Sequence, residues 1–214
     1  MTTRMLAVAC LSVVVLAAGC GKTQMNYGCP TSPEGVHPAI VGSQVPNQAV
    51  VSPEGKEVQL RDVFAAKPTV LVVYRGDWCV YCQKQLAQMQ EIEPDLMRLG
   101  YQVVAISPDT PANLKKSIVG RNLKYQLFSD TRGDVMKALG LAYSIDETTQ
   151  RAIDRDGPTL TGASAQPLYM LPVPAVFIVN RGGVIRFEHI DPDYRQRVDP
   201  QLIMAAARCL VEHL

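Results

Sequence analysis

The chain of 214 residues has little of what several classes of protein require. Its 21 Lys and Arg residues nearly balance 20 Asp and Glu residues, and no basic tract stands out. This charge pattern argues against nucleic acid as a partner. The three histidines are scattered and there is no second Cys-x-x-Cys motif, so the four ligands of a structural zinc site are lacking. The sequence contains no internal repeat, and we expect no second domain.

One apolar run dominates the amino terminus, which reads MTTRMLAVACLSVVVLAAGC. It is shorter than the ~18 to 20 residues that span a bilayer comfortably. A positive residue precedes it, and small residues lie before Cys20, so the segment resembles a bacterial lipoprotein signal ending in the lipidated cysteine. The alternative is an ordinary secretory signal in which Cys20 is incidental.

The lipoprotein interpretation divides the chain into three parts. Residues 1–19 are expected to be a signal peptide that is removed. Residues 20–40, which are rich in Gly, Pro and polar side chains, are expected to form a flexible tether. Residues 41–214 would be the domain, held outside the cytoplasm in a bacterial cell envelope by a lipid anchor in the membrane.

From residue 49 onward, the hydrophobic pattern predicts an α/β fold, with a central mixed sheet covered by helices on both faces. A small hairpin at 49–60 precedes the sheet. Strands are predicted at 69–75, 102–107 and 124–128, a second hairpin around 181–183, and a last helix at 200–213. The first long helix follows residue 79, is kinked by Pro94 and stops at Gly100, and Asp109 or Thr110 caps the next helix.

The stretch RGDWCVYCQKQ places Cys79 and Cys82 where the first central strand ends and this long helix begins. Free N–H groups at a helix start stabilise a thiolate and lower the pKa of a cysteine. A spacing of three residues also puts both sulfurs on one side of the first turn, within reach of a disulfide. A redox pair is therefore favoured over a structural disulfide and over half of a metal site.

Several separated blocks together resemble the peroxiredoxin-like members of the alkyl hydroperoxide reductase and thiol-specific antioxidant family. They are TVLVVYRGDWCVYCQKQL, VVAISPDTPANLKK, FSDTRGDVMKALGL and LPVPAVFIVNRGGVIRFEHIDPDYRQR. The resemblance runs from about residue 42 to the carboxyl terminus. It implies a thioredoxin-like fold and the thiol-based reduction of peroxides or disulfides. We expect no bound cofactor and no metal.

Two signatures within this resemblance disagree on the attacking sulfur. The peroxiredoxin pattern Pro-x-x-x-Thr-x-x-Cys would put Arg75 at the proline, Cys79 at the threonine and Cys82 at the attacking cysteine. The thioredoxin pattern Trp-Cys-x-x-Cys fits Trp78, Cys79 and Cys82 instead. Because the proline and threonine of the first pattern are missing, we expect Cys79 to be the nucleophile and Cys82 the resolving thiol.

Other positions carry alternative interpretations. The resemblance implies a cis peptide bond at Val173-Pro174, facing the cysteine pair. Asp77 could tune the thiols or cap the helix, Trp78 could shield the site or pack, and Arg75 could hold a thiolate or form a solvated salt bridge.

Two further cysteines, one in the segment before the domain and one in the last predicted helix, allow two interpretations. Cys29 and Cys209 could form a disulfide between the tether and the last helix. Alternatively, Cys209 could simply be buried.

Three function classes follow. The first is an antioxidant enzyme that reduces peroxides, and the second is a thiol-disulfide oxidoreductase that reduces disulfides of exported proteins. Either enzyme needs a thiol electron donor, such as a thioredoxin-like protein or a membrane reductant. The third is a non-enzymatic metal-carrying module on the same fold.

The lipoprotein interpretation predicts that the mature chain begins at a diacylated Cys20. Mass spectrometry of the membrane fraction of an expressing bacterium should find that residue as the modified amino terminus. A released product that begins at another residue, with an unmodified amino group, would contradict the prediction.

Overall fold

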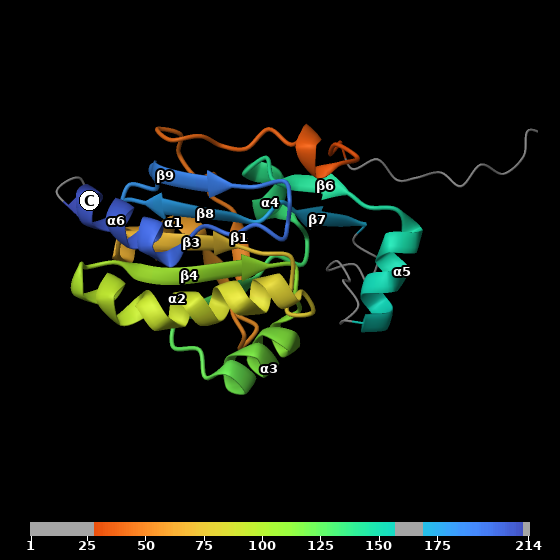
Figure 1. Ribbon diagram of the computed structural model, residues 1–214, viewed down its shortest axis with the longest axis horizontal. Helices are drawn as coiled ribbons and strands as arrows, with labels where there is room; N and C mark the ends of the chain where they lie inside the picture. The colour runs from red at the N-terminus through yellow and green to blue at the C-terminus, as the bar shows by residue number, and fades with distance from the viewer. Residues whose placement is uncertain (1–27, 157–168, 212–214) are drawn as a thin grey trace, which may run out of the picture.

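The computed structural model describes residues 28–156 and 169–211 (Figure 1). The strands are β1 (Ala49–Val51), β2 (Glu57–Gln59), β3 (Thr69–Val73), β4 (Gln102–Ser107), β5 (Gln126–Ser129), β6 (Ala142–Ser144), β7 (Met170–Pro172), β8 (Ala175–Val179) and β9 (Ile185–Ile190). The α-helices are α1 (Leu60–Ala66), α2 (Val80–Arg98), α3 (Pro111–Arg121), α4 (Asp134–Ala138), α5 (Glu147–Asp156) and α6 (Pro200–Leu210). A 3-10 turn, η1 (Pro33–Gly35), precedes them.

A seven-stranded mixed sheet forms the centre of the molecule, in the order β2-β1-β5-β4-β3-β8-β9. Strands β3, β4 and β5 run parallel, whereas β8 pairs antiparallel with β3, and β9 with β8. The predicted mixed sheet and the hairpin that precedes it are confirmed. Because the parallel strands end at the same edge, residues that follow β3 and β4 are brought together there.

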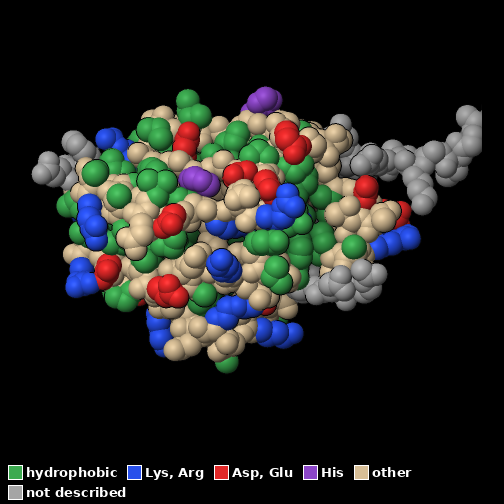
Figure 2. Space-filling model, viewed as in Figure 1, with side chains coloured by type: hydrophobic (Ala, Val, Ile, Leu, Met, Phe, Trp, Pro, Cys, Tyr) green, Lys and Arg blue, Asp and Glu red, His purple; other side chains and the backbone are tan. Residues whose placement is uncertain are grey.

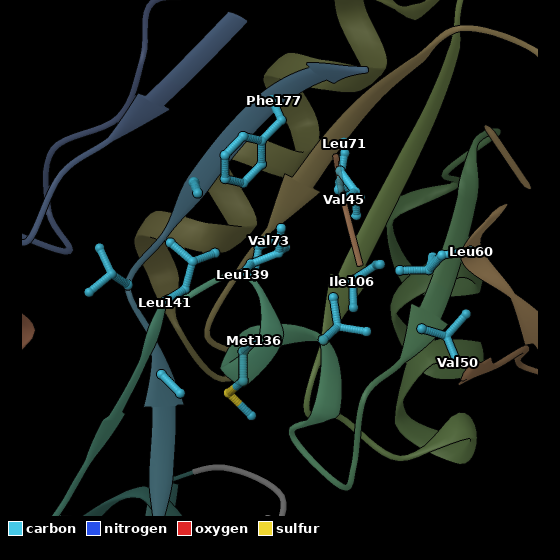
Figure 3. Packing of buried hydrophobic residues seen from close by; sticks show 14 of the residues in the cluster. Val45, Val50, Leu60, Leu71, Val73, Ile106, Met136, Leu139, Leu141 and Phe177 are labelled. Atoms are coloured by element: carbon cyan, nitrogen blue, oxygen red, sulfur yellow. The ribbon is translucent and has the colours of Figure 1, made fainter. Parts of the chain in front are cut away.

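Strand β3 is buried on both faces, as its continuous apolar sequence predicts. Its alternating side chains enter two cores. Val70 and Val72 pack with buried residues of α2, α3 and α6, whereas Leu71 and Val73 pack with those of α1 and α4. Figure 3 shows the core on the α1 and α4 side of the sheet, in which the side chains of Leu71 and Val73 lie near Ile106 of β4. Helices on both faces therefore fix the position of β3 and of the loop after it.

Helix α2 continues without interruption through Pro94, and Gly100 follows its end with φ +92°. The expected stop at Gly100 is confirmed, because a residue without a Cβ adopts this left-handed conformation at little cost. Thr110, rather than Asp109, caps α3, since its side chain accepts a hydrogen bond from the Asn113 N–H at 3.3 Å. Asp109 is thereby available for another role.

Four elements were not expected from the sequence, namely η1, α1 and the strands β6 and β7 of a separate two-stranded sheet. The short helix expected after Tyr143 corresponds to α5. The rest of the loop predicted there, at 157–168, lies outside the described residues.

Part of the segment expected as a tether makes backbone contacts with the domain. The Ala39 N–H donates to the Leu139 carbonyl at 2.9 Å, and the Pro30 carbonyl accepts from the Ser144 N–H at 2.7 Å. A Cβ on Gly140 would lie 2.0 Å from the carbonyl oxygen of His37, so the chain passes very close there. The division of the chain at residues 19 and 40 stays a prediction, and Cys20 lies outside the described residues.

Candidate active site

Cys79 and Cys82 occupy the first turn of α2, at the carboxyl-terminal edge of the parallel strands. Cys79 is the N-cap residue, with an extended backbone, and its carbonyl accepts the first helical hydrogen bond from the Gln83 N–H at 3.0 Å. Its side chain is 4% exposed, whereas that of Cys82, one turn further in, is 0% exposed. The placement predicted from the sequence is what the structure shows.

The two thiols have opposite acidities. The pKa of Cys79 is lowered to about 6, first because the Cys82 side chain donates a hydrogen bond to it, against the effect of burial. The Cys82 N–H and the charges of Arg75 and Arg197 act in the same direction. The pKa of Cys82 is raised well above its ordinary value, first by burial and then by Cys79. At neutral pH, Cys79 is therefore the thiolate and Cys82 the protonated partner.

Arg197 completes this pair from a distant part of the chain. It lies between β9 and α6, and its Nη2 donates to the Sγ of Cys82 at 3.4 Å. Another of its nitrogens, Nη1, donates to the carbonyls of Tyr194 and Gln196, which holds the guanidinium in place. Sequence reasoning missed this residue because 115 positions separate it from Cys82.

Arg75 is buried beside the pair, at 7% exposure, rather than solvated. Its guanidinium carbon lies 4.8 Å from the ring centroid of Trp78 and 4.1 Å from that of Tyr194. Such stacking on aromatic faces stabilises a cation that is partly removed from water. Arg75 is therefore not the solvated ion pair that was its alternative, and its charge lowers the pKa of Cys79.

Trp78 is half-buried and packs against both hydrophobic cores. It thus combines the packing role expected for it with a contact to the Arg75 guanidinium.

The expectation that Asp77 caps the helix is wrong, and an effect of Asp77 on the thiols stays a prediction. Its carboxylate forms an ion pair with Arg121, at the end of α3. Its N–H donates to Oδ2 of Asp109 at 2.9 Å, and no side chain makes a capping hydrogen bond at Cys79. Asp77 therefore ties the loop before Cys79 to α3 and to the end of β4.

The cis bond expected at Val173-Pro174 is also absent, since the described residues contain no cis peptide bond. The Val173 N–H donates to the Leu141 carbonyl at 2.8 Å, and Ala175 pairs with Val73. The chain thus runs extended from β7 into β8, and the intrinsic trans preference of an X–Pro bond is satisfied. Pro174 is buried and borders a narrow crevice that Gln85 and Arg197 also line.

Neither of the alternatives for Cys29 and Cys209 is found. Cys209 has a free, exposed thiol on α6, so the disulfide is not formed and the residue is not buried. Cys29 packs against the core on the α1 and α4 face, whereas α6 covers the other face of the sheet. The central sheet therefore separates the two sulfurs.

Within residues 28–156 and 169–211, no group of three or more His, Cys, Asp and Glu side chains is arranged to hold a metal ion. In the same part of the chain, no helix has the length and apolar character needed to cross a membrane.

The acidity of Cys79 leads to a pH-dependent prediction. Alkylation by iodoacetamide under native conditions should accelerate as the pH rises through about 6, because the reactive thiolate of Cys79 forms there. Cys82→Ala should move the inflection to higher pH, since the hydrogen bond from Cys82 is the largest cause of the low pKa. Peptide mapping gives the rate at each cysteine.

Cys209→Ala serves as the control, because this exposed cysteine lies away from the pair and its removal should leave the Cys79 profile unchanged. A wild-type inflection near pH 8 to 9 at Cys79, the range of an ordinary thiol, would contradict the electrostatics described here.

Comparison with known proteins agrees with this geometry. The profile of the AhpC/TSA family matches residues 41–188. The thiol-disulfide oxidoreductase ResA of Bacillus cereus is 31% identical over 121 residues, which cover 56% of this chain and 67% of ResA. The peroxiredoxin bcp1 of Schizosaccharomyces pombe is 30% identical over 112 residues, which cover 52% of this chain and 57% of bcp1.

Solved peroxiredoxin structures share the fold. Reduced Prx3 of Vibrio vulnificus, in complex with hydrogen peroxide, superposes with a TM-score of 0.65 at 16% identity, over 79% of this chain and 99% of Prx3. Peroxidoxin BcpB of Mycobacterium tuberculosis superposes with a TM-score of 0.60 at 17% identity, over 79% of this chain and 97% of BcpB. The chain is a thiol-based oxidoreductase with a thioredoxin-like fold, and it belongs to the AhpC/TSA family.

Proposed function

We propose that the protein reduces hydroperoxides, with Cys79 as the attacking thiolate and Cys82 as the resolving thiol. The observation that carries this proposal is the state of Cys79. Its pKa of about 6 makes it a thiolate at neutral pH, yet its side chain is only 4% exposed. A hydroperoxide is small enough to reach a sulfur at this depth, and a thiolate is the form that attacks it.

The reaction has two balanced steps. The Cys79 thiolate attacks one peroxide oxygen, so that an S–O bond forms, the O–O bond breaks and an alcohol or water leaves after protonation. This step oxidises Cys79 to a sulfenic acid. The Cys82 sulfur then attacks the Cys79 sulfur, and a disulfide forms as water is released. A thiol donor supplies the two electrons that reduce the disulfide again.

The guanidinium groups of Arg75 and Arg197 support the first step. Both act on the charge of Cys79, and Arg197 also contacts Cys82. Positive groups held in place before the reaction stabilise the negative charge that passes from sulfur to the departing oxygen. Arg75 is positioned by its two aromatic neighbours, Trp78 and Tyr194, and needs no rearrangement to act.

Reduction of protein disulfides is the second candidate. It is favoured by the apolar side chains around the pair, since Val80, Tyr81 and Tyr194 are 66%, 38% and 39% exposed. Figure 2 shows hydrophobic side chains gathered over the amino-terminal end of α2, next to Lys and Arg side chains. A polypeptide could dock on such a surface, and ResA is named as a thiol-disulfide oxidoreductase.

The proposal places this activity in a bacterial cell envelope, with the domain held at a membrane by a lipid on Cys20. This part rests on the sequence of residues 1–20, in which an apolar run and small residues precede the cysteine. The metal-carrying alternative is not supported by a cluster of ligands among the residues that the structure describes.

Stopped-flow fluorescence of the reduced protein distinguishes the two substrates, because Trp78 is the only tryptophan and precedes Cys79 directly. We expect the second-order rate constant with hydrogen peroxide or cumene hydroperoxide to exceed that with the disulfides of insulin. Cys209→Ser should react at the wild-type rate, since this exposed thiol lies outside the site. Faster oxidation by insulin than by either peroxide would favour the disulfide reductase instead.

A further inference from the structure

The resolving step requires Cys82 to lose a proton in a place that water does not reach. The Cys82 side chain is 0% exposed, and its pKa is raised well above the ordinary value, first by burial. From outside α2, the Arg197 guanidinium and the backbone N–H of Arg75 contact its sulfur, and neither can accept a proton. The Cys82 thiol donates to Cys79, which is no longer a thiolate once it has become a sulfenic acid. Side chains beneath the first turn of α2 are therefore the candidates for a proton acceptor.

Tyr74 and Ser107 lie there as neighbours on adjacent strands. The Tyr74 N–H donates to the Ile106 carbonyl at 3.0 Å, which continues the parallel pairing of β3 with β4. Tyr74 belongs to the same core cluster as Cys82. Since side chains alternate along a strand, Ser107 follows Val103 and Ala105 onto this same face.

The buried carboxylate of Asp109 stands next to this pair. The Ser107 hydroxyl donates to its Oδ2 at 2.9 Å, and the Asp77 N–H donates to the same oxygen at 2.9 Å. The other oxygen, Oδ1, is buried and has no hydrogen-bond partner within the described residues. A carboxylate that is 1% exposed with one oxygen unsatisfied is costly, so a structural role alone does not explain it.

Electrostatics link the two ends of this cluster. The pKa of Tyr74 is raised well above its ordinary value, first by burial and then by Asp109, with smaller effects from Asp77 and Cys82 and an opposing contact with Ser107. The Tyr74 hydroxyl is buried, has no hydrogen-bond partner within the described residues, and lies within electrostatic range of both Cys82 and Asp109. A hydroxyl can accept one proton while it donates another, which makes Tyr74 suited to connect them.

We propose that Tyr74, Ser107 and Asp109 form the proton acceptor for the Cys82 thiol in the resolving step of the proposed function. As the Cys82 sulfur bonds to the Cys79 sulfur, the thiol proton passes to Tyr74 while Asp109, through Ser107, receives a proton from the hydroxyl network. The S–O bond of the sulfenic acid breaks, and its oxygen leaves as water when the proton returns. The disulfide is formed with no net change in the cluster.

This role predicts that the rate of the resolving step depends on pH and falls as the pH falls. Burial raises the pKa of Asp109 to about 6, and the negative charge of Asp77 acts in the same direction, whereas Ser107, the Asp77 N–H and Arg121 lower it. Above pH 6 the carboxylate is ionised and can accept a proton. Below pH 6 it is protonated, so the resolving step slows as the pH falls, independently of the thiolate fraction of Cys79.

Asp109→Asn and Tyr74→Phe test the proposal, with Asp130→Asn as the matched control. Asp130 follows β5 as Asp109 follows β4, is 4% exposed and has a pKa of about 6, but its carboxylate caps α4 through the N–H groups of Val135 and Met136. Trp78 fluorescence should show a peroxide-dependent phase for oxidation of Cys79 and a peroxide-independent phase for disulfide formation.

We expect Asp109→Asn and Tyr74→Phe to slow the second phase by about 100-fold, the scale of general acid–base catalysis. The inflection near pH 6 should disappear from that phase in Asp109→Asn. Asp130→Asn should retain the wild-type rate and inflection. A second phase that keeps its rate and pH profile in Asp109→Asn and Tyr74→Phe would overturn the proposal, as would equal slowing in the control.

A reaction without peroxide separates this inference from the proposed function. Cys79 attacks 5,5′-dithiobis(2-nitrobenzoate) and releases one coloured thiolate, and Cys82 then releases the second as it resolves the mixed disulfide. If the protein reduces peroxides slowly but the second release still depends on Asp109, the proposed function is refuted and this inference stands. Asp109→Asn could also change the turn at Asp77, and a shift in the native alkylation profile of Cys79 would reveal this. In that case Tyr74→Phe decides the result, because it leaves that turn intact.

Discussion

The hydrogen bond from Cys82 to Cys79 is the interaction on which the chemistry of this site depends. It is the largest single cause of the low pKa of Cys79, and it exists because both residues lie in the first turn of α2. The N-cap position leaves the outer sulfur next to free N–H groups, while the inner sulfur is enclosed by the core. One turn of helix thereby separates a thiolate from a protonated thiol of the same type.

The sheet supplies the rest of the site by bringing distant segments to one edge. Strand β3 leads into the loop that carries Arg75 and Trp78, and β4 ends at Ser107, two residues before Asp109. The segment after β9 adds Tyr194 and Arg197, which lie against the cation and the inner thiol. Positive charge is thus held beside the thiols, and a buried carboxylate lies at the same edge of the sheet. This division of charge suits a reaction in which one sulfur attacks as an anion and the other must lose a proton.

Much of the fold and the position of the cysteine pair could be predicted, because both leave local signals in the sequence. A continuous apolar run identifies β3, and two cysteines three residues apart mark the helix start at which we propose the redox centre. The contacts of Arg197 and Tyr194 leave no such signal, since they arise only when β9 and α6 pack onto the sheet. The sequence left the cap of α3 open between Asp109 and Thr110, because both satisfy the same local rule, and the structure assigns it to Thr110. Pro174 was expected to be cis through family resemblance, and the extended path from β7 into β8 shows it to be trans.

The identity of the attacking sulfur is tested most directly by locating the sulfenic acid after one equivalent of hydrogen peroxide. Cys82→Ser and Cys79→Ser proteins are treated with peroxide and a dimedone-type probe, and the labelled peptide is identified by mass spectrometry. The site described here requires rapid labelling of Cys79 in Cys82→Ser and essentially no labelling in Cys79→Ser, where the remaining thiol is buried and protonated. Rapid labelling of Cys82 in Cys79→Ser would show instead that the inner sulfur attacks, in the peroxiredoxin register.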